Sequence, residues 1–166
     1  MKYFLDTEFF EDGKTIELIS IALRREDDES FYAINEDADY SRIEKDEWML
    51  NNVLRRLPNA INSAWMPKEQ IKIKLLEFIG DDKEPEFWAD YASYDWIVLC
   101  QLFGRMIDLP KHFPMFCMDI QQLKNQVGFE GEFPIKNPKP HDAQYDAREC
   151  KQRWEFLQEW YWSNRL

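Results

Sequence analysis

The sequence predicts an α/β protein in which a mixed sheet carries helices on both of its faces. Three strand-like segments follow one another at the N-terminus, and helical segments then alternate with short apolar strands. A strand meander followed by such alternation is typical of α/β architectures. At 166 residues the chain is expected to form one domain, 1–166, which buries roughly 70% of its unfolded surface.

The first three strands are predicted from apolar segments and from the turns between them. Residues 3–10 and 15–23 are apolar segments on either side of an Asp-Gly turn at 11–14, which indicates a hairpin. A second acidic turn leads to residues 30–34, which we expect to form the third antiparallel strand.

Two helices are predicted in the middle of the chain. Residues 35–45 are acidic and are expected to form a surface loop. Residues 47–57 then place apolar side chains on one helix face, and Pro58 ends that helix. Pro67 suits the first turn of the next helix, which Gly80 ends.

The C-terminal half continues the alternation of strands and helices. Asp119 is a suitable N-cap, and the segment 128–140 contains 2 Gly and 3 Pro, which favours irregular structure. The expected elements are, in order, a strand at 86–90, a helix at 94–103 ended by Gly104, a strand at 115–118, a helix from Asp119 through Lys124, a loop at 128–140 and a helix at 143–162.

The composition limits the possible partners and compartments. A formal net charge of -11 argues against duplex nucleic acid bound through a broad basic surface, but it allows a narrow site that grips phosphates through metal ions. The three cysteines are odd in number and widely spaced, so we interpret them as reduced residues of a cytoplasmic protein. The N-terminus does not resemble a signal peptide and no apolar run approaches about 18 residues, so no membrane association is expected.

Two acids lie inside the otherwise apolar first strand. Because the side chains of a strand alternate between faces, Asp6 and Glu8 point the same way, while Leu5, Thr7 and Phe9 point the other way. Unit charges about 4 Å apart repel by roughly 4 kcal/mol at an effective dielectric of about 20, and a divalent cation would remove that repulsion. The alternative is a frayed strand end whose acids face water or pair with Lys or Arg.

Two further acids lie at the starts of predicted helices. Asp95 and Asp146 each occupy a position where the helix dipole favours a negative charge, so each has a structural explanation when taken alone. His141 precedes Asp146 by five residues, a step that places two side chains on different helix faces. We therefore expect His141 in the loop, with Asp142 as the N-cap of the last helix.

Together these residues resemble the three motifs of a known enzyme family. Residues 4–9 (FLDTEF), 94–95 (YD) and 141–147 (HDAQYDA) are similar in order, spacing and type to the exonuclease motifs of the DEDDh branch of the DnaQ-like 3'-5' exonucleases. Residues 9–21 and 88–104 further resemble the adenosine-specific exoribonuclease (RNase AS-like) group of bacteria and phages. One departure is Tyr91, which stands where many members carry an Asn that contacts substrate.

The resemblance implies a ribonuclease H-like fold with a five-strand mixed sheet, and a metal-dependent enzyme that hydrolyses single-stranded RNA from its 3' end to nucleoside monophosphates. It implies a preference for adenylate-rich ends and a homodimer. Two Mg²⁺ ions, or Mn²⁺, would be the cofactors, one generating hydroxide and the other stabilising the leaving 3'-oxygen. The implied ligands are Asp6, Glu8, Asp95 and Asp146, with His141 as the general base.

Other functions compete with this one. The same chemistry could act on DNA or short oligonucleotides, and the same fold could serve as a non-catalytic nucleic-acid or protein-binding module. The presence of all five site residues disfavours the binding module, and a second acid pair with a histidine fits metal chemistry better than a glycosidase. The aromatic residues near the motifs are interpreted as packing or core residues rather than base platforms: Phe10, Trp48, Trp65, Tyr94, Trp96 and Tyr145.

Overall fold

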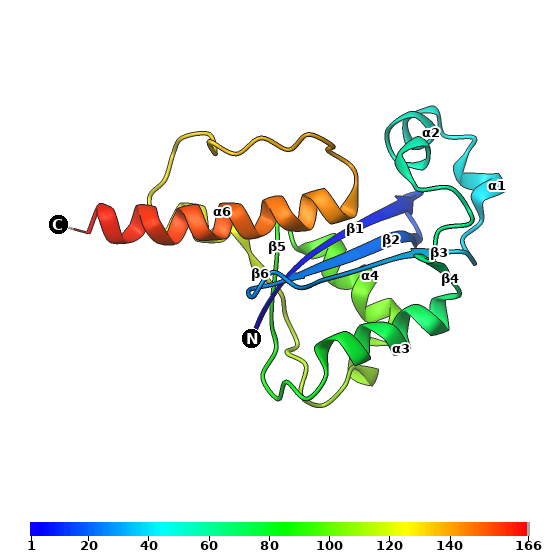
Figure 1. The fold of residues 1–166 in the computed structure, drawn as a ribbon, viewed down its shortest axis with the longest axis horizontal. Helices are drawn as coiled ribbons and strands as arrows, with labels where there is room; N and C mark the ends of the chain where they lie inside the picture. Colours follow the sequence, from blue (N-terminus) through cyan, green and yellow to red (C-terminus); the bar gives the residue numbers. More distant parts are fainter. Residues whose placement is uncertain (166) are drawn as a thin grey trace.

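A computed structural model describes residues 1–165 as a six-stranded sheet with helices on both faces (Figure 1). The strand order is β4-β3-β2-β1-β5-β6. The β1–β2 and β2–β3 pairs are antiparallel, whereas the β1–β5, β3–β4 and β5–β6 pairs are parallel. The strands are β1 (Lys2–Glu11), β2 (Ile16–Arg25), β3 (Ser30–Asn35), β4 (Trp65–Met66), β5 (Glu86–Ala89) and β6 (Met118–Asp119).

The mixed sheet and the N-terminal meander are confirmed, but the sheet has one strand more than the five expected. The additional strand is β4, whose two residues pair in parallel with Ile34 and Asn35 of β3. A two-residue strand is too short to show alternation in the sequence. Its pairing arises only because the chain returns along the edge of β3, so the five-strand expectation is corrected to six.

Two helices cover one face of the sheet, below it in Figure 1. They are α3 (Lys68–Ile79) and α4 (Ser93–Phe103), close to their predicted bounds. Ile71 of α3 and Leu99 of α4 are fully buried with Leu5 of β1 in the largest hydrophobic cluster. This packing holds the first turn of α4 beside the sheet.

A single long helix, α6 (Ala143–Ser163), runs along the other face (Figure 1). Cys150 of α6 packs with Phe4 of β1, and Asp142 caps the helix N-terminus as predicted. Helices therefore lie on both faces, as expected. The loop of residues 127–142, which precedes α6, carries no regular structure.

The segment after β3 differs from its prediction. The expected loop contains the short helix α1 (Tyr40–Ile43), and the expected helix at 47–57 is divided into α2 (Glu47–Asn52) and the 3₁₀ turn η1 (Leu54–Arg56). Two consecutive asparagines weaken the helix at its end, and α2 stops at its C-cap Val53, where φ is -114°. Val53 is nevertheless buried, so the break keeps this segment packed on the sheet.

The remaining elements lie near their predicted positions. The 3₁₀ turn η2 (Met106–Asp108) follows α4, and Asp119 caps α5 (Ile120–Gln126) as expected. The strand expected at 115–118 is confined to β6, because Met115 and Phe116 are exposed in the approach to it. None of the helices within residues 1–165 is long and apolar enough to cross a membrane.

Candidate active site

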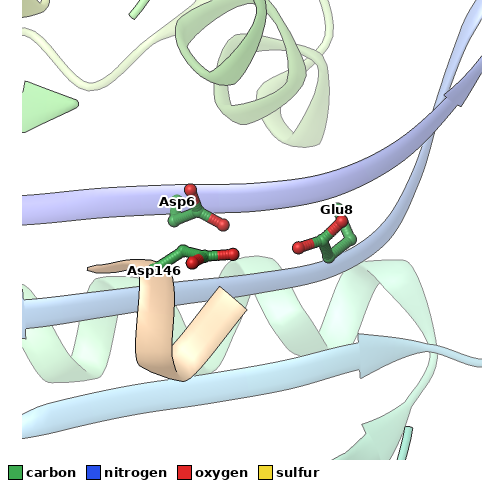
Figure 2. Close-up of side chains that lie close together, drawn as sticks. All are labelled: Asp6, Glu8 and Asp146. Atoms are coloured by element: carbon green, nitrogen blue, oxygen red, sulfur yellow. The ribbon is translucent and has the colours of Figure 1, made fainter. Parts of the chain in front are cut away.

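Three carboxylates converge where β1 passes the start of α6 (Figure 2). Asp6 and Glu8 come from β1 and Asp146 comes from the first turn of α6. One oxygen from each lies within 4.8 Å of the others. Asp146 follows Glu8 by 138 residues in the chain, and the packing of α6 on the sheet brings the two together.

The pleat of β1 explains why its acids face α6. Phe4, which packs under α6, lies on the same side as Asp6 and Glu8, whereas Leu5 packs toward α3 and α4. The predicted division of faces is thus confirmed. A β-bulge follows directly, because Glu8 pairs with Ser20 but the next residue pairs with Leu18. Bulges often occur beside functional sites, where they change the direction of a strand.

Asp95 reaches the same place from the opposite side of the sheet. β5 pairs with β1 only as far as Phe4, so Thr7 has no β5 partner. Asp95, in the first turn of α4, takes that position: its Oδ1 accepts bonds from the Thr7 backbone N (2.8 Å) and from Thr7 Oγ1 (2.6 Å). Asp95 is therefore fixed with one oxygen bound to β1, and it lines the same cleft as the three clustered acids.

Asp146 is oriented by the loop that precedes α6. The backbone N of His141 donates to its Oδ2 at 2.8 Å, and the Asn137 side-chain amide donates to its Oδ1. Charge-assisted bonds of this kind hold a carboxylate in one orientation. The role of Asn137 was not predicted, since nothing in a Pro-rich loop sequence indicates which residue turns toward the helix.

His141 lies at the rim of the cleft, in the loop as predicted. Its backbone has φ at 62°, a left-handed conformation that a non-glycine residue rarely adopts. Its ring contacts the Trp48 ring edge-on, with centroids 5.0 Å apart. Partial burial, and then the nearby Arg56 guanidinium, lower the pKa of His141, which favours the neutral imidazole at pH 7.

Burial and neighbouring carboxylates raise the pKa values of all four acids. Burial is the largest cause in each case. The pKa of Asp6 rises well above its usual range, with Asp95 and Glu8 as the next causes. The pKa of Glu8 rises to about 8, that of Asp95 to about 7 and that of Asp146 to about 6. These acids therefore resist carrying their full charge unless a cation lies among them.

The acids and His141 line one open cleft of about 570 Å³. Its aromatic rim was only partly predicted. Trp48 and Tyr94 are 53% and 49% exposed and line the cleft, so neither is a core residue. Trp96 is buried and Trp65 packs on Tyr40, as predicted. Periodicity identifies a helix face, but it does not distinguish a face on the core from a face on a cleft.

The donor set suits hard divalent cations. Asp6, Glu8 and Asp146 offer only carboxylate oxygens, which Mg²⁺ and Mn²⁺ prefer. No hydrogen bond from residues 1–165 reaches the side chain of Asp6 or Glu8, so their oxygens are free for a metal ion. The residues present therefore fit a metal site of the expected kind.

Comparison with known proteins gives the same enzyme class as the sequence motifs. The family model of the 3'-5' exoribonuclease Rv2179c-like domain matches residues 1–158. The chain is 39% identical over 162 residues to the 3'-5' exoribonucleases Rv2179c and MT2234.1 from two strains of Mycobacterium tuberculosis, covering 95% of this chain and 93% of each relative. A structure of S. pombe Pop2p in its Mg²⁺- and Mn²⁺-bound form matches with a TM-score of 0.56 at 13% identity, covering 97% of this chain and 84% of that one.

The sheet order and the match to Pop2p place the chain in the ribonuclease H-like fold class. More specifically, the chain belongs to the Rv2179c-like family of 3'-5' exoribonucleases. The predicted DEDDh exonuclease family and the predicted enzyme class are both confirmed.

The raised pKa values predict how metal-free stability depends on pH. Because the site acids have pKa values of about 6 to 8 when folded and about 4 when unfolded, the folded state binds protons more tightly. Their contribution to the free energy of unfolding is complete below about pH 4 and is lost as the pH rises through about 8. In EDTA, urea denaturation should show stability falling from about pH 5 to 8, and Mg²⁺ should restore it.

The control for this experiment is the variant Glu8→Gln, which removes one of the mutually repelling charges. Its metal-free stability should depend less steeply on pH over the same range. The electrostatic account would be contradicted if the stability of the wild type in EDTA rose with pH, or if millimolar Mg²⁺ left that stability unchanged.

Proposed function

We propose that this protein is a metal-dependent exoribonuclease that removes nucleoside monophosphates from the 3' end of single-stranded RNA. The observation that carries the proposal is the convergence of Asp6, Glu8 and Asp146 within 4.8 Å in an open cleft. The family's name supplies the substrate and direction of cleavage, and the carboxylates supply a reason for metal dependence. DNA and short oligonucleotides are the competing substrates.

The proposed metal ligands are Asp6, Glu8, Asp95 and Asp146, which would hold two Mg²⁺ ions, with Mn²⁺ as an alternative. Such ions supply Lewis-acid catalysis of phosphodiester hydrolysis and neutralise charge that develops on phosphate. Asp95 keeps its Oδ2 available, because Thr7 binds only Oδ1. The hydrogen bonds from Asn137 and His141 to Asp146 fix the fourth ligand before any ion arrives.

His141 is the proposed general base. It lines the cleft beside the acids, and its lowered pKa leaves it neutral and able to accept a proton at pH 7. Its position in a loop rather than on α6 separates it from the ligand set. His141 would therefore take a proton from the attacking water without holding the metal.

The substrate is expected to enter by its 3' end alone. The cleft is lined by acids, and the net charge of -11 leaves little basic surface for a long strand. By resemblance to the adenosine-specific group we assign a preference for adenylate-rich ends. The same resemblance supports a homodimer, while the chain length supports a single catalytic domain and the cysteine pattern supports a cytoplasmic location.

Substitution at His141 separates the base from the ligands. His141→Ala should lower the single-turnover rate about 10²- to 10⁴-fold, the usual value of general-base assistance, while Mg²⁺ affinity stays nearly unchanged. Asp146→Asn should instead weaken Mg²⁺ binding measured by calorimetry. The base assignment fails if His141→Ala weakens metal binding as much as Asp146→Asn does, and metal dependence fails if EDTA leaves cleavage intact.

Thr7 provides a test of how Asp95 is held. Thr7→Val keeps the side-chain shape but removes the 2.6 Å bond to Asp95 Oδ1. Loss of such a supporting bond should lower apparent Mg²⁺ affinity or activity by about 10- to 100-fold. Activity measured against Mg²⁺ concentration gives the affinity, and the control is Thr15→Val in the exposed β1–β2 turn. An unchanged Mg²⁺ dependence in Thr7→Val would show that Asp95 does not depend on this bond.

The preference for one nucleobase in the RNA is tested with matched 5'-labelled oligomers. We expect kcat/KM on oligo(A) to exceed that on oligo(U) and oligo(C) by about 10-fold or more, as for a site that hydrogen-bonds one base. Binding should depend only weakly on salt, because about one to three phosphates are engaged. Equal rates on the three RNAs contradict the preference, and faster cleavage of oligo(dA) favours the DNA alternative.

A further inference from the structure

The segment Glu47–Arg56, which comprises α2 and η1, contacts the loop that carries His141 at two points. The Trp48 ring lies edge-on to the His141 ring, at 5.0 Å between centroids and 75° between planes. The Arg56 guanidinium donates a hydrogen bond to the carbonyl oxygen of Pro140, the residue just before His141. Neither contact follows from the exonuclease motifs, because this segment lies outside all three.

The exposure of Trp48 indicates that its position is not explained by burial. Its side chain is 53% exposed, although α2 buries Met49 on its other side. Asp46 caps α2 by accepting from Met49 N at 3.0 Å, and Met49 and Val53 pack with Ile19 of β2. The segment is therefore anchored to the sheet, and this anchoring holds Trp48 at the cleft.

The His141 side chain is not anchored in the way that α2 is anchored to the sheet. The backbone N of His141 binds Asp146, but the imidazole makes no hydrogen bond within residues 1–165. Its backbone is in the left-handed region, which must be held by surrounding contacts. Trp48 and Arg56 supply contacts at the ring and at the preceding peptide.

We propose that Glu47–Arg56 is a positioning element for the general base, with Trp48 fixing the orientation of the imidazole and Arg56 fixing the loop behind it. This inference rests on the proposed role of His141. Trp48 would act through His141 rather than on RNA. Because a displacement of about 1 Å in a catalytic group costs on the order of 10²-fold in rate, loss of the ring contact should be measurable.

The competing role for Trp48 is to stack on a nucleotide base, since its exposed ring lines the cleft. The two roles predict different kinetics. A positioning residue lowers kcat and leaves KM nearly unchanged, whereas a stacking residue raises KM. A positioning residue also has no effect once His141 is absent, whereas stacking energy remains.

The experiment is a double-mutant cycle on the Mg²⁺-loaded enzyme. Trp48→Ala should lower the single-turnover rate about 10- to 100-fold at saturating RNA, with little change in the RNA concentration that gives half the maximal rate. In the His141→Ala background the same substitution should cause less than about a 2-fold further loss. Trp48→Phe, which retains an aromatic edge, should recover most of the rate.

One control and one further test variant separate positioning from general damage. Trp162→Ala removes a tryptophan that is 66% exposed near the C-terminal end of α6, and it should leave both constants unchanged. Arg56→Gln removes the bond to Pro140 without altering the lining of the cleft, and it should lower the rate only when His141 is present. Thermal melting of each variant confirms that it is folded.

The outcomes are distinct. If His141→Ala lowers the rate but Trp48→Ala and Arg56→Gln do not, the positioning inference is overturned and the proposed function stands. A raised KM for Trp48→Ala, with equal losses in both backgrounds, assigns Trp48 to base stacking and also overturns it. If His141→Ala cleaves as fast as the wild type, the base assignment fails first, and the positioning inference fails with it.

Discussion

The active site depends on keeping like charges together. Unit charges about 4 Å apart repel by roughly 4 kcal/mol at an effective dielectric of about 20, and all four site acids line this cleft. The fold relieves the repulsion unequally. Asp95 and Asp146 accept hydrogen bonds from Thr7, Asn137 and His141, whereas the side chains of Asp6 and Glu8 receive none from residues 1–165. The remaining repulsion lies on the strand acids, where a cation would have its greatest effect.

The sheet topology makes this arrangement possible. β5 stops pairing with β1 at Phe4, and this early end leaves Thr7 open to Asp95 from α4. On the other face α6 packs against β1 and brings Asp146 beside Asp6. Because β1 lies between β2 and β5, its acids are carried on a strand held from both sides. Elements from both faces thus meet at one point of the central strand.

The sequence alone was sufficient for the residues whose position follows from local rules, and insufficient where tertiary packing decides. Alternation in β1 correctly separated Asp6 and Glu8 from Thr7, and capping chemistry correctly placed Asp142. Neither rule gives the strand order or reveals β4, since pairing partners are far apart in the chain. Trp48 fits a packing position by helical spacing, yet it lines the cleft, while Met49 of the same helix packs with Ile19 of β2.

The division between rigid and irregular elements follows from what each group must do. Asp6, Glu8, Asp95 and Asp146 must stay close against their own repulsion, so they lie on strand and helix backbones whose hydrogen bonds resist displacement. A base must only reach the water that attacks substrate, so it does not need such a scaffold. The loop of residues 127–142 can carry it, provided that neighbouring elements fix its end. Contacts from α2 and η1 meet that requirement, because the Trp48 ring lies against the His141 ring and the Arg56 guanidinium donates to the Pro140 carbonyl oxygen.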